Sequence, residues 1–114
     1  MYDLSGKRVW VAGHKGMVGG AIARRLAAED CEVLTVDRTE LDLTDQRAVL
    51  GWMHNQRPQV VFLAAARVGG IHANNTQPVD FLRDNLMIET AIFTGAESVG
   101  VEKLLFLGFV DHRQ

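Results

Sequence analysis

Short apolar runs alternate along the chain with longer stretches in which apolar residues recur every three to four positions. The runs 7–12, 32–36, 60–64 and 103–107 are rich in valine and leucine, which is typical of buried β-strands. The periodic stretches predict helices over 17–29, 45–56 and 78–99. This alternation of strand and helix predicts an α/β fold, with a parallel sheet, right-handed crossovers and helices on both faces.

Local signals refine some of the element boundaries. Thr44 is a candidate N-cap for the second helix, Pro78 suits the first turn of the third, and Gly100 ends it. The segment Leu41–Leu43 is extended but follows the second strand too closely for a helix to intervene. It is either a fragment of strand at the sheet edge or a loop.

A glycine-rich loop joins the first strand to the first helix. Gly13, Gly16 and Gly19 spell G-x-x-G-x-x-G at that junction. In a dinucleotide-binding loop the first glycine permits a tight turn. The second lets the backbone approach a pyrophosphate, and the third lets helix and strand pack closely. Because the strand and helix contexts are both present, the motif predicts dinucleotide binding, with a turn of purely structural use as the alternative.

Charged residues near this loop bear on the choice between NAD and NADP. Lys15 lies within the loop and Arg38 lies just beyond the second strand, where the ribose 2′ position is expected. Two cations favour the 2′-phosphate of NADP. Asp37 argues for NAD, because an acidic residue there usually accepts a hydrogen bond from the 2′-hydroxyl. NADP is the favoured prediction, and the alternative is that Lys15 and Arg38 are ordinary solvated charges.

Three small residues follow the third strand, at the sheet edge where ligands bind in such folds. Ala64, Ala65 and Ala66 would let a cofactor lie close to the backbone. Close packing of a helix explains the same pattern equally well.

Composition excludes several classes of protein. The 114 residues are enough for one domain; 47% of them are hydrophobic and the net charge is −2, without a basic stripe, which argues against nucleic acid as a partner. No apolar run is long enough to span a bilayer, and the N-terminus does not read as a secretory signal. Cys31 is the only cysteine and the four histidines show no metal-ligand spacing. We therefore predict a cytoplasmic protein without a metal site.

Longer stretches of the sequence resemble one enzyme family. The runs 9–22 (VWVAGHKGMVGGAI), 40–45 (ELDLTD), 63–75 (LAAARVGGIHANN) and 103–108 (KLLFLG) are similar to the start of GDP-L-fucose synthases, which are extended short-chain dehydrogenase/reductases. The third run is more specific than the glycine loop, because most related enzymes lack it. The resemblance covers residues from about 7 to 108, and it implies an NAD(P)-binding Rossmann fold that is incomplete here.

The resemblance implies a reaction and a cofactor site. Members of this family epimerise GDP-4-keto-6-deoxy-D-mannose at C3 and C5 and then reduce its C4 ketone with NADPH, giving GDP-L-fucose. By resemblance, the glycine loop would hold the pyrophosphate, and Lys15 and Arg38 the 2′-phosphate. The full set of implied cofactor-binding residues is Gly13, His14, Lys15, Gly16, Met17, Val18, Gly19, Arg38, Leu43, Ala64, Ala65, Ala66, Leu107 and Gly108. A homodimer is a further possibility, since helices that relatives use for dimerisation overlap 78–99.

The chain departs from the family pattern after Gly108. There the family continues with Ser-Ser-Cys and later Tyr-x-x-x-Lys, which position the substrate and donate the proton, whereas this chain has the segment 109–114 (FVDHRQ). Its only tyrosine is Tyr2. We therefore expect a truncated Rossmann domain over 1–108 with an unrelated tail, no catalytic residues, and a GDP-sugar substrate only in a full-length relative. The abrupt change favours a frameshift or truncation, and the alternatives to an inactive fragment are a non-catalytic NADP-binding module and a non-functional remnant.

Overall fold

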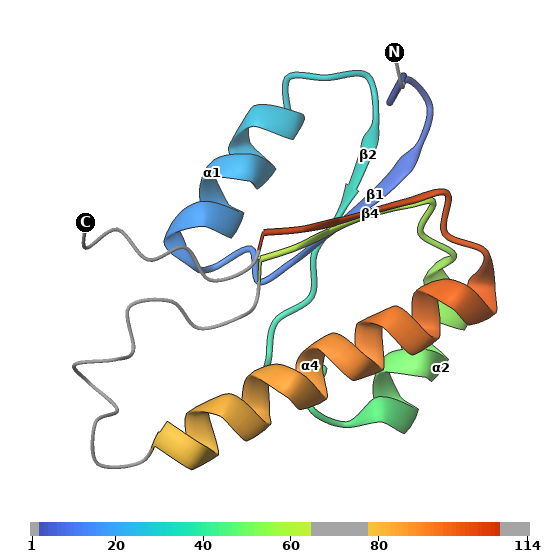
Figure 1. The fold of residues 1–114 in the computed structure, drawn as a ribbon. Coiled ribbons are helices and arrows are strands. Elements are labelled where there is room, and N and C mark those ends of the chain that lie inside the picture. Colours follow the sequence, from blue (N-terminus) through green and yellow to red (C-terminus); the bar gives the residue numbers. More distant parts are fainter. Residues whose placement is uncertain (1–2, 65–77, 108–114) are drawn as a thin grey trace.

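A computed structural model describes the backbone of residues 3–64 and 78–107, and the side chains of 3–64 and 83–107. Figure 1 shows a sheet flanked by helices. The strands are β1 (Arg8–Ala12), β2 (Glu32–Leu34), β3 (Val60–Leu63) and β4 (Lys103–Phe106), and the helices are α1 (Met17–Leu26), α2 (Gln46–Gln56) and α4 (Pro78–Val99).

The sheet has the order β2-β1-β3-β4, and every neighbouring pair is parallel. Trp10 in β1 stands opposite Leu34 in β2 and Val61 in β3, and Val61 stands opposite Leu104 in β4. Strand β2 thus lies on one side of β1. The chain then crosses to the other side of β1, where β3 and β4 follow. The predicted parallel α/β sheet is confirmed.

Helices cover both faces of the sheet, with α1 on one side and α2 and α4 together on the other (Figure 1). Successive β1 residues alternate between the two cores. Trp10 belongs to the core beneath α2 and α4, where its ring centroid lies 4.4 Å from that of Trp52. Val9 and Val11 belong to the core beneath α1. Burial of a large apolar side chain stabilises a fold by about 1.5–3 kcal/mol, so the continuous apolar runs hold the layers together.

Several element boundaries differ from those predicted by sequence. Helix α1 ends at Leu26 with Ala27 as its C-cap, because the amides that follow Ala27 bond three residues back instead of four; the Glu29 N–H donates to the Leu26 carbonyl at 2.9 Å. The predicted N-cap Thr44 is wrong. Asp45 caps α2 by accepting a hydrogen bond from the Ala48 amide at 3.1 Å, whereas the Thr44 hydroxyl donates to Asp42 at 2.7 Å.

The segment after β2 proves to be a loop and not a strand fragment. Strand β2 ends at Leu34, two residues earlier than predicted, where its pairing with β1 also ends. Leu41 and Leu43 nevertheless lie inside the core under α2 and α4, each with 5% of its surface exposed. Their apolar side chains therefore anchor the loop that connects β2 to α2.

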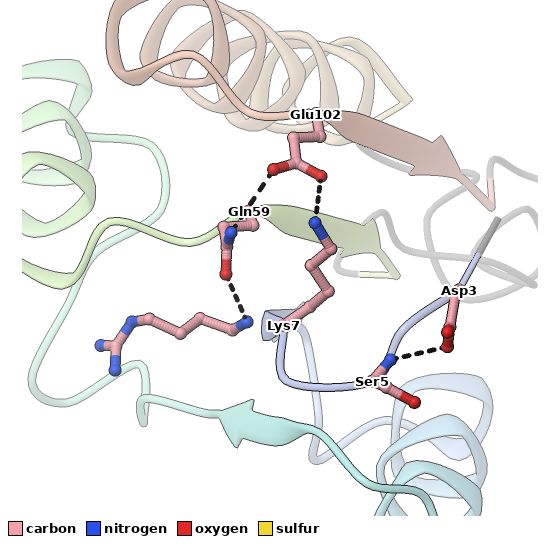
Figure 2. Close-up of polar contacts among 6 residues, drawn as sticks. Asp3, Ser5, Lys7, Gln59 and Glu102 are labelled. Atoms are coloured by element: carbon pink, nitrogen blue, oxygen red, sulfur yellow. Dashed lines mark hydrogen bonds and ion pairs between the residues drawn. The ribbon is translucent and has the colours of Figure 1, made fainter.

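Polar side chains tie the strands together at the amino edge of the sheet (Figure 2). The Lys7 ammonium lies 2.8 Å from one oxygen of Glu102, just before β4, and the Gln59 amide donates to the other oxygen at 3.4 Å. Gln59 also accepts a hydrogen bond from the Arg8 amide at 3.0 Å. The Arg8 guanidinium adds bonds to Gln56 and to Glu32 in β2, so all strands are linked at this end.

Candidate functional site

Most of the described residues that were predicted to form a site follow the carboxyl ends of the strands, opposite the polar network. Because the strands are parallel, the segments that follow them emerge at this same edge. Ala64 continues the ladder by donating to the Ala12 carbonyl at 2.8 Å, and Leu107 donates to the Leu63 carbonyl at 3.0 Å. The connection from β1 leads to β2 on one side of β1, and the connection from β2 leads to β3 on its other side. The strand order therefore reverses between β1 and β3. In α/β sheets, ligands bind at the carboxyl ends of the strands at such a topological switch point.

The glycine loop makes the turn from β1 into α1. Gly13 has φ +95°, a backbone conformation that side chains strongly disfavour. Gly19 packs against the start of the loop so closely that a Cβ atom there would lie 2.7 Å from the Gly13 carbonyl carbon. Gly16 is different: a Cβ atom there would meet only the Gly13 oxygen, at an ordinary 3.5 Å. The first and third glycines are thus required by the fold, and the second is not.

The amino end of α1 is open to solvent and lacks a side-chain cap. Gly16 is the N-cap residue and has no side chain to cap the helix, and the first turn contains no acidic residue. Met17 is 91% exposed and Val18 is 48% exposed. Since the first amides of a helix have no partner within the helix, this end presents free N–H groups and a positive dipole end. Such an end suits an anion such as phosphate.

Two oppositely charged side chains meet beside this loop. The Lys15 ammonium from the glycine loop forms an ion pair with a carboxylate oxygen of Asp37, which follows β2. The Lys15 hydrogen bond, followed by the Thr39 backbone and hydroxyl bonds, lowers the pKa of Asp37 to about 2. The same bond to Asp37 raises the pKa of Lys15. Lys15, which favoured NADP in the sequence, and Asp37, which favoured NAD, therefore form an ion pair with each other.

A second acidic side chain lies near the other predicted cation. Hydrogen bonds from the Thr44 hydroxyl and amide lower the pKa of Asp42, and the positive charge of Arg38 adds to this effect. Arg38 and Lys15 are thus each accompanied by an aspartate. The cluster of Lys15, Asp37, Arg38 and Asp42 is consequently close to neutral in net charge.

Sequence reasoning missed Thr39, which holds Asp37 in position. Its amide and hydroxyl donate to one Asp37 oxygen at 3.0 and 3.1 Å. The signal was present as the spacing Asp-x-Thr, which recurs at Asp42 and Thr44 with the same bonds. Aspartate followed two residues later by a donor is typical of an Asx turn.

The structure describes only some of the remaining residues that were predicted to bind a cofactor. Leu43 is buried in the core, and Ala64 and Leu107 are half-buried at the sheet edge. Ala65, Ala66 and Gly108 lie outside the described residues. That these positions contact a cofactor stays a prediction, as it does for His14, Met17 and Val18.

Residues 3–64 and 78–107, which the structure describes, lack two features. They contain no group of three histidine, cysteine, aspartate or glutamate side chains placed to hold a metal ion. Within the same ranges, none of the helices has the length and apolar character needed to cross a membrane.

Known proteins resemble this chain in sequence and in fold. It is 57% identical to a GDP-L-fucose synthase of Sinorhizobium fredii over 108 residues, which cover 95% of this chain and 34% of that protein. It is 51% identical to the GDP-L-fucose synthase of Escherichia coli, covering 92% of this chain and 33% of that protein. The solved structure of MlghC, a GDP-mannoheptose C4 reductase from Campylobacter jejuni with NADP bound, superposes with TM-score 0.82 at 34% identity, covering 89% of this chain and 32% of that one.

The similarity to these relatives is confined to part of their length. The chain spans about a third of the curated relatives that it matches, and the resemblance to the N-terminal part of GDP-L-fucose synthases is confirmed. Residues 9–109, most of the chain, match the pattern of one family. With its parallel sheet and glycine loop, the chain belongs to the NAD dependent epimerase/dehydratase family.

Proposed function

We propose that this chain binds NADP(H) as the cofactor-binding portion of a GDP-L-fucose synthase-like enzyme. The observation that carries the proposal is the glycine loop. It turns from β1 at Gly13, packs through Gly19, and presents the uncapped end of α1 at the carboxyl edge of the sheet. Relatives with the same fold and sequence pattern support NADP, and so do the cations Lys15 and Arg38.

The residues have defined tasks in this proposal. The backbone amides at the start of α1 would hold the pyrophosphate, and Gly16 would let it approach without a side chain in the way. Lys15 and Arg38 would neutralise the 2′-phosphate of the adenosine ribose. When bound, the cofactor supplies the hydride for reduction of a keto sugar. The protein residues described here bind and orient the nucleotide.

We further propose that these 114 residues do not reduce a GDP-sugar by themselves. The sequence contains no Tyr-x-x-x-Lys, the motif that supplies the proton in this family, and Tyr2 is the only tyrosine. We propose GDP-4-keto-6-deoxymannose as the substrate only for a full-length relative of this chain. The domain boundary is likewise proposed at residue 108, with 109–114 as a separate tail.

Nucleotide titration tests the proposal. Purified protein is titrated with NADPH, and binding is followed by nucleotide fluorescence and by thermal melting. We expect saturable binding, tighter for NADPH than for NADH, and stabilisation of about 2.7 kcal/mol at a nucleotide concentration 100 times the Kd. Absence of saturation with both nucleotides would refute cofactor binding. NADPH oxidation by the chain alone, in the presence of GDP-4-keto-6-deoxymannose, would refute the proposed inactivity.

A second candidate function is a nucleotide-binding module that works with another polypeptide. Exposed aromatic residues favour it: Phe93 on α4 and Phe106 on β4 pack edge to face with ring centroids 6.3 Å apart, yet are 42% and 46% exposed. We propose mixing the chain with the separately expressed C-terminal two-thirds of a close relative. Recovery of reductase activity would favour the module, and its absence would favour an inactive fragment.

A further inference from the structure

The carboxylate of Asp37 is held from two sides. One oxygen faces the Lys15 ammonium in an ion pair. The other accepts hydrogen bonds from the Thr39 amide at 3.0 Å and from the Thr39 hydroxyl at 3.1 Å. The Asx turn therefore holds the Asp37 carboxylate beside the glycine loop even when Lys15 moves away. The Lys15 side chain is 71% exposed and can move more freely.

This ion pair bridges the ends of two adjacent parallel strands. Lys15 lies in the loop after β1, and Asp37 lies three residues beyond the last residue of β2. In a fold of this kind, the adenosine ribose of a dinucleotide lies at this place. A free carboxylate here accepts a hydrogen bond from a 2′-hydroxyl and repels a 2′-phosphate. A free ammonium has the opposite preference.

We propose that Asp37 sets the nucleotide selectivity of this chain by competing with the 2′-phosphate for the Lys15 ammonium. For the 2′-phosphate of NADP(H) to bind the Lys15 ammonium, the ion pair with Asp37 must break. The fixed Asp37 carboxylate then remains close to the phosphate. NAD(H) leaves the ion pair in place, and its 2′-hydroxyl donates to Asp37. The carboxylate therefore reduces the preference for NADPH over NADH. This inference rests on the nucleotide site proposed above.

Removal of the charge at position 37 tests the competition. The substitution Asp37→Asn should tighten NADPH binding about fivefold, on the scale of one exposed ion pair, and weaken NADH binding by a similar factor. Asp37→Ser is a second variant that keeps an oxygen for the turn with Thr39. Glu40→Gln is the matched control, because it removes an equal charge from an exposed side chain three residues further on. It should change neither affinity.

A double-mutant cycle tests whether the effect passes through Lys15. In a Lys15→Gln background, Asp37→Asn should tighten NADPH binding less than it does in the wild type, because no ammonium remains to be released and only the repulsion between the carboxylate and the 2′-phosphate is relieved. Thermal melts of all variants confirm that they are folded. A gain of the same size without Lys15, or an unchanged ratio of NADPH to NADH affinity in both Asp37 variants, overturns the inference. Binding of NADPH by the wild-type chain would still support the proposed function in that case. Failure of the wild-type chain to bind either nucleotide overturns both.

Discussion

The backbone carbonyl of Gly13 occupies the space that a side chain on Gly19 would need. A Cβ atom on Gly19 would lie 2.7 Å from the Gly13 carbonyl carbon and 3.2 Å from the His14 Cα. These are backbone atoms in a tight turn, so they cannot move aside as the end of a flexible side chain can. The contact fixes how α1 leaves the sheet, and therefore where its amino end points.

We expect Gly19→Ala to unfold or distort this junction. Overpacking of a rigid site costs about 1–3 kcal/mol, and the distortion should abolish NADPH binding as well. Urea unfolding and nucleotide titration measure the two effects. Gly51→Ala in α2 is the matched control, because a Cβ atom there meets nothing within 4 Å. That control should stabilise the protein by about 0.5–1 kcal/mol, since alanine favours a helix over glycine.

Gly16→Ala should separate binding from folding. Gly16 has φ −76°, which any residue adopts, and a Cβ atom there would make only an ordinary contact. The free energy of unfolding should fall by no more than about 1 kcal/mol, because alanine is a poorer N-cap residue than glycine but makes no clash here. NADPH affinity should fall about tenfold or more, because the methyl group would hold the pyrophosphate away from the backbone. Equal affinity for the wild type and this variant would contradict the assigned role of the second glycine.

Acid should weaken the folded state through Asp37. Its pKa is about 2 in the folded chain against an ordinary 3.8, so the lowered pKa contributes stability above pH 4 that is lost as the pH falls through 2. Between these values the wild type should lose stability faster than Asp37→Asn. Urea midpoints at several pH values check this. Parallel curves for the two proteins would show that the Lys15 and Thr39 bonds do not stabilise the fold.

Arg8→Lys should weaken the amino edge of the sheet. The guanidinium donates to the Gln56 carbonyl at 2.8 Å and to the Glu32 carboxylate at 2.7 Å, a fork that an ammonium cannot reproduce. We expect a loss of about 1–2 kcal/mol in the free energy of unfolding, measured with urea. Arg25→Lys, which changes an exposed pair between the last turn of α1 and Glu29 just beyond it, should cost less than about 0.5 kcal/mol.

The elements and their order could be predicted from sequence, because buried strands and amphipathic helices leave strong apolar patterns. Boundaries were less certain where two residues compete for one role. Thr44 and Asp45 are both good capping residues, and only the turn that binds the Thr44 hydroxyl to Asp42 leaves Asp45 to cap α2. Sequence alone gives no means of ranking these two local hydrogen bonds.

The glycine loop was predictable for a different reason. Its spacing reflects steric demands that the backbone imposes locally, as Gly13 and Gly19 show. The ion pair between Lys15 and Asp37 was not predicted, although both residues were singled out. Their meeting depends on how far a flexible lysine reaches between two loops, and no local pattern encodes that distance. The cofactor contacts themselves stay predictions.

We expect the polar network to give the two ends of the sheet different dynamics. At the amino edge, bonds among Lys7, Gln59 and Glu102 link segments far apart in sequence, so opening this edge requires breaking several bonds (Figure 2). At the other end, an ion pair joins the loops of Lys15 and Asp37, and the Lys15 side chain is 71% exposed. Amide hydrogens near the strand starts should therefore exchange with solvent only on global unfolding, while those of the glycine loop exchange through local opening. The sheet can thus loosen at the end proposed to admit a nucleotide while the rest stays closed.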